Sequence, residues 1–419
     1  MNKQNNNVRA LIMAGGSGTR FWPESTKACP KQYLALVSEK TLLEETLERI
    51  KNLVPAENRY IVTIKKQSAL AKKYSQHYLP PQNLLLEPCA RNTAPCILLA
   101  LLSILEQQIP HRSLDEVTED IVIILPSDHA ILNHNGFEKT LNQAIQFLQQ
   151  RPAQDNKIIT IGIVPHFPHT GYGYISPNMD TPLDLEKGIY PVITFKEKPN
   201  SETAKLYLRQ GYFWNAGMFI GKIGTFLQQF AQHAPTIYAY KDKISKLLAT
   251  QKNYILDGID SAGRDTYEEL LLSCYKQIPA NSIDYAVMEK SQAVALISAK
   301  FDWNDLGSWD ALAALHREKI SNAHVENNSM MEMSNGTNDT NSSTNSNLLI
   351  NNNQRYFFKN ASNNFIKSNP QQMVVAIGVD DLIIINNDKT LVIMPQRDAQ
   401  QIKEVVNFLE KQDWGDEYF

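Results

Sequence analysis

Short apolar runs alternate with longer amphipathic segments over the first half of the chain. Five runs rich in β-branched residues stand out between residues 8 and 164: VRALIMA, RYIVTI, NLLLEP, DIVIILP and KIITIGIV. Segments with helical periodicity separate them, as at residues 41–52, where Thr41 and Glu44 have the spacing of a capping box. This alternation is typical of βαβ units and predicts an α/β fold with a doubly wound, mainly parallel, Rossmann-like sheet.

The second half of the chain changes character twice. Helical patterns dominate from residue 222 to 274, and an extended run at AVALISAKFDW precedes another helix at GSWDALAALHRE, so we assign residues 1–325 to one large domain. From 326 to 355 Asn, Ser, Thr and Met replace apolar periodicity, which predicts a flexible insertion or linker. Residues 356–419 predict a small β-rich domain, which closes with an amphipathic helix carrying Ile402, Val405, Val406 and Leu409 on one face.

Composition narrows the class of protein further. A net charge of -3 over 419 residues gives no electrostatic reason to expect nucleic acid as a partner. The longest apolar stretch, APCILLALLSIL, is shorter than the ~20 residues that span a bilayer, and MNKQNNNV at the N-terminus lacks the apolar core of a secretory signal. We therefore expect a cytoplasmic protein without a membrane span. The four cysteines have no C-x-x-C spacing, which favours free thiols over a zinc or redox site.

A loop rich in glycine and positive charge follows the first predicted strand, in LIMAGGSGTRFWPESTKACPKQYL. Glycines at this position let backbone amides approach an anion closely, most often a phosphate. The loop lacks the G-K-[ST] of a P-loop, and Phe21 replaces the third glycine of a dinucleotide-binding fingerprint. Arg20 and Lys31 supply cations that a triphosphate needs, although a tight turn with two solvated cations would show the same residues.

GGSGTRFWP followed by PKQYL resembles the signature of sugar-1-phosphate nucleotidyltransferases, and the FWPES-x4-PKQ form is similar to their mannose-1-phosphate guanylyltransferase branch. Seven further motifs of the family follow in order: EPCARNTAPC, LPSDH, TGYGYI, FKEKP, FWNAGMF, NSIDYAVMEK and WNDLGSWDAL. The resemblance covers residues 8–320, and the C-terminal segment is similar to the short β-helical tail of the family. It implies that GTP and mannose 1-phosphate form GDP-mannose and diphosphate by in-line attack on the α-phosphorus, with Mg²⁺ as cofactor.

The resemblance also assigns site residues. It implies catalytic roles for Arg20, Lys31, Asp128 and Lys198, and metal binding by Asp128 and Asp305. Two carboxylates are enough for Mg²⁺, which keeps water and substrate oxygens as its other ligands. Without the resemblance, Asp128 could equally be a turn residue. The nucleotide would meet Gly15, Gly16, Ser17, Gly18, Thr19, Arg91, Asn92, Thr93 and Ser127.

The sugar phosphate would meet Gly173, Glu197, Lys198, Asn215 and Asp284. Lys198 precedes Pro199, which predicts an extended backbone that directs its amine into a cleft. Asp284 could instead cap the helix that follows it. We expect His129 to be structural, because the attacking phosphate oxygen is already ionised at neutral pH and needs no general base.

Two alternative functions stay open at this point. One is a nucleotidyltransferase of the same family with another base or sugar, and the other is a non-catalytic regulatory subunit that senses GDP-mannose. A sensor would be expected to lose the catalytic cations or acids, whereas Arg20, Lys31, Asp128, Lys198 and Asp305 are all present. Many relatives continue into an isomerase domain, and because this chain ends at Phe419 we expect no isomerase activity. The expected partners are small-molecule substrates, with no nucleic acid and no membrane, and a homodimer is possible.

Overall fold

The computed structural model describes residues 6–16, 18–151, 155–256, 261–326, 347–350 and 355–418. The chain forms two compact units. The first unit comprises residues 1–15, 43–127 and 131–303, and the second unit comprises residues 16–42, 128–130 and 304–419. The insertion predicted at 326–355 lies outside the described residues except for 326, 347–350 and 355.

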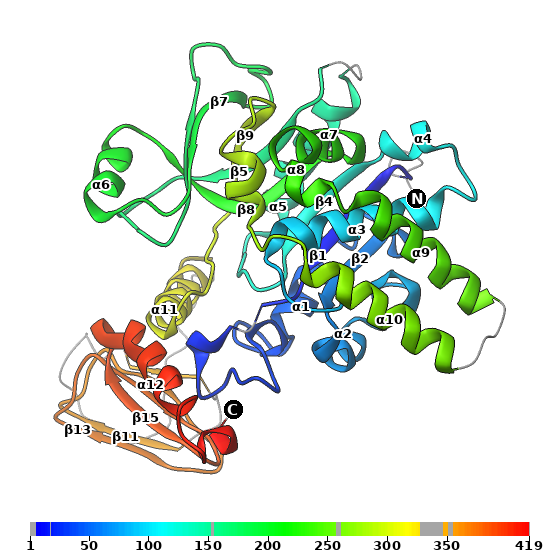
Figure 1. Ribbon diagram of the computed structural model, residues 1–419. Coiled ribbons are helices and arrows are strands. Elements are labelled where there is room, and N and C mark those ends of the chain that lie inside the picture. Colours follow the sequence, from blue (N-terminus) through cyan, green and yellow to red (C-terminus); the bar gives the residue numbers. More distant parts are fainter. Residues whose placement is uncertain are drawn as a thin grey trace. The chain divides into compact units, whose positions relative to one another are not determined.

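A nine-stranded sheet forms the centre of the first unit (Figure 1). Its strands are β1 (Val8–Met13), β2 (Arg59–Ile64), β3 (Leu84–Glu87), β4 (Ile121–Pro126), β5 (Ile158–Ile163), β6 (Tyr174–Pro177), β7 (Ile189–Lys196), β8 (Phe213–Lys222) and β9 (Val294–Ser298), in the order β3-β2-β1-β4-β8-β5-β9-β7-β6. The five strands predicted before residue 164 are thereby confirmed. The predicted parallel arrangement holds for β3-β2-β1-β4 and for β5-β9.

Apart from β5-β9, the pairings in the other half of the sheet are antiparallel. β8 runs antiparallel to β4, β5 and β6, and β7 runs antiparallel to β6 and β9. Apolar periodicity reports which residues are strands and not the direction in which each strand runs, so this part of the arrangement was not predictable from the pattern. The sheet is therefore mixed, with β3-β2-β1-β4 as its parallel half.

Helices cover both faces of the sheet. The first unit contains α1 (Leu42–Arg49, whose first residue belongs to the second unit), α2 (Ser68–Ser75), α3 (Thr93–Gln108), α4 (Leu114–Thr118), α5 (His134–Gln149), α6 (Ser201–Arg209), α7 (Ile223–His233), α8 (Pro235–Tyr238), α9 (Lys241–Leu256) and α10 (Ser261–Lys276). The apolar run near residue 100 forms the buried helix α3, which packs against α9, and α9 packs against α10 (Figure 1). Leu11 and Val122 share a core with α3, while Ile12 and Ile123, which point the other way, are equally buried.

The second unit contains α11 (Trp309–Glu326) and the β-rich segment. The strands are β10 (Leu348–Leu349), β11 (Tyr356–Lys359), β12 (Phe365–Lys367), β13 (Val374–Ile377), β14 (Leu382–Asn386) and β15 (Leu391–Pro395), followed by α12 (Ile402–Leu409). Phe365 pairs with Ile383 and Ser362 bonds Asp380, in parallel register at a separation of 18 residues. Parallel neighbours at a constant offset are the pattern of a β-helix, as predicted.

The C-terminal helix agrees with its predicted amphipathic pattern in three of four positions. Ile402, Val406 and Leu409 are buried, whereas Val405 is 37% exposed and does not share their buried face. On the helical wheel Val405 falls at the edge of the stripe formed by Ile402, Val406 and Leu409, so its side chain points partly to solvent.

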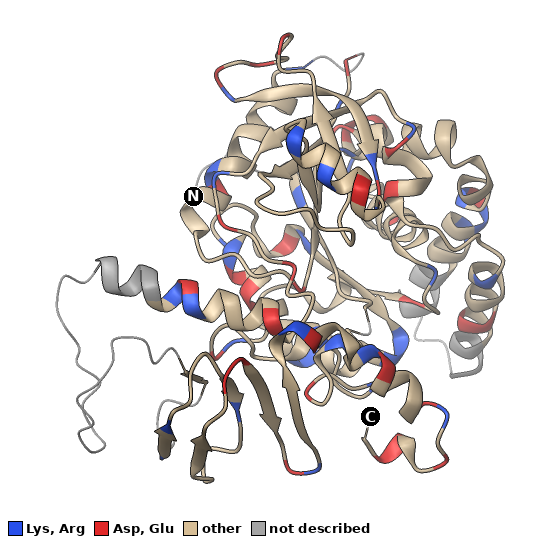
Figure 2. Ribbon diagram, turned by 90° about the vertical axis from the view of Figure 1, so that its left-hand side faces the viewer, with Lys and Arg blue, Asp and Glu red and all other residues tan. Residues whose placement is uncertain are grey.

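Charged side chains of both signs are mixed over helices and loops, and few lie on the strands (Figure 2). Arg9 on β1, Arg59 on β2, Glu87 on β3 and Lys222 on β8 are charged and buried. The guanidinium of Arg9 pairs with Asp120 at 2.7 Å. All four cysteines, each within a described range, are free thiols. In the described part of the chain, no helix combines the length and the apolar character that a membrane crossing requires.

Candidate active site

The glycine-rich loop brings Gly18 and Lys31 together in the second unit. Gly18 has a φ of +57°, and a Cβ at this position would lie 2.3 Å from Cβ of Lys31, so only glycine fits on both grounds. No described atom lies within 4 Å of where a Cβ on Gly16 would stand, and the Gly16 carbonyl accepts a hydrogen bond from Gln32. The space that a side chain on Gly16 would fill is therefore open. Thr19 begins a short 3₁₀ turn that carries Arg20, and Ser17 lies outside the described residues.

Lys31 joins the two aspartates that the resemblance assigns to the metal. Its side chain is almost fully buried, and Nζ donates to Oδ2 of Asp128 at 3.0 Å and to the main-chain oxygen of Asp305 at 2.6 Å. The carboxylate of Asp128 is 38% exposed. Partial burial raises the pKa of Asp128, but the charges of Lys31, His129 and Arg20 outweigh this effect and lower the pKa below its usual value. Asp128 is therefore ionised at neutral pH.

Arg20 and Asp305 converge over Gly307. A Cβ on Gly307 would lie 3.1 Å from Oδ2 of Asp305 and 3.3 Å from Nη1 of Arg20. Among the residues that the structure describes, no group of three or more His, Cys, Asp or Glu side chains could hold a metal ion. Carboxylate oxygens suit a hard divalent ion, which takes water and phosphate oxygens as its other ligands, and two aspartates are too few for a structural zinc site. The donor set of Asp128 and Asp305 fits the divalent metal of a nucleotidyltransferase.

A second cluster, in the first unit, centres on Glu197. Its backbone N–H donates to Oε1 of Glu289 at 2.8 Å, and its own Oε1 pairs with Nζ of Lys198 at 3.1 Å. Oε2 of Glu197 is buried, and no group in the described ranges hydrogen-bonds to it. A Cβ on Gly173 would lie only 2.5 Å from this oxygen, so the carboxylate faces space that glycine leaves free. A buried carboxylate oxygen without a hydrogen-bond donor is unusual in a folded protein and is suited to accept from a ligand hydroxyl.

Asn215 and Asp284 complete this cluster. Nδ2 of Asn215 donates to Oδ1 of Asp284 at 2.8 Å, and Oδ1 of Asn215 accepts from the Gly217 N–H at 3.0 Å. Burial raises the pKa of Glu197, the charge of Asp284 raises it further, and Lys198 opposes both. Burial likewise raises the pKa of Asp284. Asp284 starts a π-helical turn (Asp284–Met288) in which the Ser282 hydroxyl accepts from the Tyr285 N–H at 3.3 Å, so the geometry favours the contact of Asp284 with Asn215 over the capping alternative.

Lys198 does not have the extended backbone that we predicted. Its φ is +46°, and the prediction was wrong because the proline that follows disfavours the right-handed helical region without excluding the left-handed one. Asn92 and Leu306, in two other family motifs, also have positive φ values of 70° and 47°. For residues other than glycine this conformation costs about 1–3 kcal/mol and is concentrated at functional sites. Three of the motif loops therefore hold a strained backbone.

Three other residues assigned to the nucleotide, Arg91, Thr93 and Ser127, make hydrogen bonds within the protein. Helix α3 begins at Thr93 with Asn92 as its N-cap, so Arg91, Asn92 and Thr93 lie at a junction between a loop and a helix. Oγ1 of Thr93 accepts from the backbone N–H of Ile283, and Arg91 donates to the main-chain oxygen of Tyr275 at 3.4 Å. Ser127 is buried, and its N–H donates to the main chain of β1. Thr93 and Ser127 thus each have at least one polar group engaged in a hydrogen bond that stabilises the fold.

Sequence reasoning gave no role to Glu87, the last residue of β3. It is buried, its Oε1 accepts a 2.6 Å hydrogen bond from the Tyr275 hydroxyl, and its Oε2 is 3.5 Å from where a Cβ on Gly15 would lie. Burial raises the pKa of Glu87. A carboxylate at the end of the apolar run LLLE was the available signal, since the carboxyl ends of parallel strands border ligand sites. Glu289, which anchors Glu197, was also missed, because its partner is far away in the sequence.

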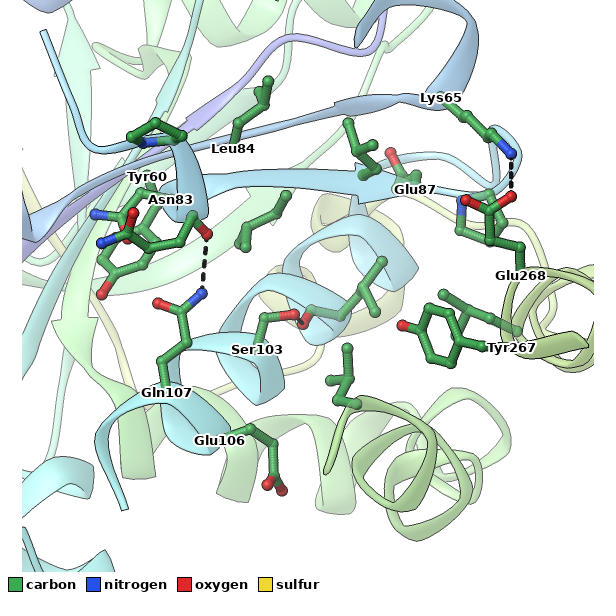
Figure 3. Close-up of a pocket in the computed structure, with 18 of the residues that line it drawn as sticks. Tyr60, Lys65, Asn83, Leu84, Glu87, Ser103, Glu106, Gln107, Tyr267 and Glu268 are labelled. Carbon is green, nitrogen blue, oxygen red and sulfur yellow. Dashed lines mark hydrogen bonds and ion pairs between the residues drawn. The ribbon is translucent and has the colours of Figure 1, made fainter. Parts of the chain in front are cut away.

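A cavity of about 1010 Å³ runs along β3 in the first unit and is lined by β3, α3, α9 and α10 (Figure 3). Its lining includes the apolar side chains of Leu84, Leu99 and Leu271 and the glutamates 57, 87, 106, 268 and 269. Among these lining residues, all within described ranges, Lys65 is the only Lys or Arg, and it pairs with Glu268. The negative lining disfavours a triphosphate, and none of the described site residues predicted from the sequence contributes to it. This cavity is distinct from both clusters described above.

Known families match both the first three quarters of the chain and its C-terminal segment. The family described as "Nucleotidyl transferase" matches residues 9–322, and the one described as "MannoseP isomerase/GMP-like beta-helix domain" matches residues 359–409. The "Putative mannose-1-phosphate guanylyltransferase" of Vibrio cholerae is 30% identical over 96% of this chain and 74% of its own length. The "Mannose-1-phosphate guanylyltransferase" of Klebsiella pneumoniae is 31% identical over 97% of this chain and 75% of its own. A crystal structure named "mannose-1-phosphate geranyltransferase", from Thermus thermophilus, is 27% identical, with a TM-score of 0.72 over 96% of this chain and 99% of that one.

Proposed function

Because the chain belongs to the nucleotidyl transferase family, we propose that it is a mannose-1-phosphate guanylyltransferase, which converts GTP and mannose 1-phosphate to GDP-mannose and diphosphate. The observation that carries this proposal is the contact of Lys31 with both Asp128 and Asp305 beside an open glycine loop. A loop that only turned the chain would have no need of a buried ammonium held by the carboxylate of Asp128 and the main-chain oxygen of Asp305.

In this proposal the second unit binds and activates the triphosphate. The phosphates bind in the space beside Gly16 that a side chain would otherwise fill and next to the cations Arg20 and Lys31, which stabilise the charge that accumulates on the departing diphosphate. Asp128 and Asp305 would hold Mg²⁺, which when bound neutralises phosphate charge and lets two anions approach each other. The nucleophile is an ionised phosphate oxygen, so His129, whose Nε2 is 3.9 Å from Asp128, has no proton to remove.

The first unit binds the sugar phosphate. Lys198 presents a half-exposed ammonium that attracts the phosphate, and Oε2 of Glu197 accepts a hydrogen bond from a sugar hydroxyl above Gly173. Asn215 holds the carboxylate of Asp284 in place as a further acceptor. Transfer is then direct, and no residue of the chain forms a covalent bond to the nucleotide. The cytoplasmic location and the homodimer remain predictions, which cell fractionation and light scattering would check.

The test is product analysis with purified protein, GTP, mannose 1-phosphate and Mg²⁺. We expect GDP-mannose and diphosphate in equal amounts, none in the presence of EDTA, and recovery when Mg²⁺ is restored. Because transfer is direct, labelled diphosphate should not exchange into GTP while mannose 1-phosphate is absent. Binding of GDP-mannose without turnover would instead identify a sensor, and exchange without the sugar phosphate would contradict direct transfer.

A further inference from the structure

The residue pair that follows Arg20 is anchored by the far end of the same unit. Trp22 is 6% exposed, and its ring packs with Ile402, Val406 and Leu409 of α12. Its Nε1 donates to the main-chain oxygen of Tyr418 at 3.0 Å, in the 3₁₀ turn (Gly415–Tyr418) after α12. The loop that carries Arg20 is therefore attached to the last helix of the chain by both apolar packing and a hydrogen bond.

The next two residues of the loop contact other parts of the β-rich segment. The Pro23 carbonyl accepts from Nδ2 of Asn387, in the turn between β14 and β15, at 3.3 Å. Glu24 pairs with Nζ of Lys367, at the end of β12, at 2.6 Å, and both side chains are about one-fifth exposed. Three consecutive loop residues thus contact three different elements of residues 365–418.

The opposite side of the loop is held by the residue that starts α11. Trp309 is fully buried, and its Nε1 donates to the main-chain oxygen of Trp22 at 3.0 Å. Its ring meets the ring of Phe21 edge-on, with centroids 5.0 Å apart and an interplanar angle of 61°. Phe21 and Trp22 are therefore fixed from two directions, by α11 and by α12.

We propose that residues 365–418 position the loop of Arg20 and Lys31 for the reaction, and that Trp22 is the positioning residue through which α12 acts. The 3₁₀ turn of Thr19–Phe21 has only three residues and is not stable alone, so tertiary contacts must set the direction of Arg20. A misplacement of about 1 Å at a reacting centre can reduce the rate by about 100-fold. The β-rich segment would then contribute to turnover without touching substrate. This inference rests on the proposed function for the identity of the reaction.

The test compares two loop-contact variants with a matched control in the full-length protein. Val406→Ala removes side-chain volume beneath the Trp22 ring, and Trp22→Phe removes the Nε1 donor together with ring area. Ile383→Val is the control, because Ile383 is buried in β14 of the same segment and pairs with Phe365 and Met394 rather than with the loop. All four proteins are assayed below their melting temperatures in both directions of the reaction.

We expect both loop-contact variants to raise the KM for diphosphate in the reverse reaction by about 5- to 10-fold and to lower kcat by about 10-fold. The KM for mannose 1-phosphate should stay within about twofold of wild type, because Lys198 and Glu197 belong to the first unit. Loss of folded protein lowers the maximal rate and leaves KM unchanged, so the KM for diphosphate separates positioning from instability. The control should match wild type in all three constants.

Hydrogen exchange provides a readout that does not need turnover. Amides of residues 18–31 should exchange faster in Val406→Ala and Trp22→Phe than in wild type, and their exchange rates should be unchanged in Ile383→Val. If wild type is active while both loop-contact variants keep its KM for diphosphate and its loop exchange, the inference is wrong. An inactive wild type would refute the proposed function instead, and equal loop exchange in all four proteins would then still overturn the positioning role.

Discussion

Gly173 is the position where a single methyl group should disturb the sugar site most selectively. A Cβ on this residue would lie 2.5 Å from Oε2 of Glu197 and 3.2 Å from Cβ of Asn215. Asn215 lies on β8 and is held through both ends of its amide, so it cannot move away. In a Gly173→Ala variant the Glu197 carboxylate must therefore shift by roughly 1 Å to reach an ordinary contact distance.

The magnitude follows from the hydrogen bond that this shift would break. A hydrogen bond to a charged group contributes about 1.5–3 kcal/mol, and 1.4 kcal/mol corresponds to a tenfold change in affinity. We therefore expect Gly173→Ala to raise the KM for mannose 1-phosphate by about 10- to 140-fold. The KM for GTP should not change, because Gly173 and Glu197 lie in the cluster assigned to the sugar phosphate.

Initial rates at saturating GTP and varied mannose 1-phosphate would measure this effect. A double variant supplies the control. If the methyl group acts by displacing the carboxylate, adding Gly173→Ala to Glu197→Gln should raise the KM for mannose 1-phosphate by less than about threefold. The reasoning is refuted if the single variant keeps a KM for mannose 1-phosphate within twofold of wild type. A parallel rise in the KM for GTP would also refute it, because it would indicate general distortion.

Three further predictions concern acidic side chains. Asp128→Asn should lower kcat by at least about 100-fold at saturating Mg²⁺, and turnover within a few-fold of wild type would overturn the metal assignment. Tyr275→Phe removes the hydroxyl that donates to Glu87 and should lower the free energy of unfolding by about 1–3 kcal/mol in urea denaturation. Burial raises the pKa of Glu197, so this carboxylate becomes protonated at a higher pH than an ordinary glutamate does. Protonation removes the acceptor for the sugar hydroxyl. The KM for mannose 1-phosphate should therefore rise as the pH falls toward the raised pKa. In Asp284→Asn the rise in KM should occur at a lower pH, because the charge of Asp284 raises the pKa of Glu197. A rise in KM that persists in Glu197→Gln would be caused by protonation of the substrate phosphate instead.

The elements that local pattern specifies were predicted well. β1, β4 and the buried helix α3 carry apolar runs whose length and composition leave little choice of structure. The direction of β8 was not predictable, because it depends on how the chain returns to the sheet after β7 and not on the residues of β8 itself. The left-handed backbone of Lys198 was also missed, since local sterics disfavour that conformation and the surrounding structure imposes it.

The site residues also differ in whether the sequence alone could identify them. No spacing rule relates Lys31 to Asp128 or Asp305, and only the resemblance to a family gave a reason to name all three as site residues. The hydrogen bonds of Lys31 to both aspartates were not predicted. The groups that support the site residues had no such guide. Glu289 anchors the backbone of Glu197 across 92 residues, and a contact at that distance leaves no signal in a single sequence.

Diphosphate release from the purified protein, with Mg²⁺ and each pairing of GTP, UTP, dTTP or ATP with mannose 1-phosphate or glucose 1-phosphate, tests the central claim most directly. The proposed function predicts strong preference for GTP with mannose 1-phosphate. Efficient turnover of another pair would contradict that specificity while keeping the nucleotidyltransferase chemistry, and no turnover of any pair would contradict the enzymatic function itself.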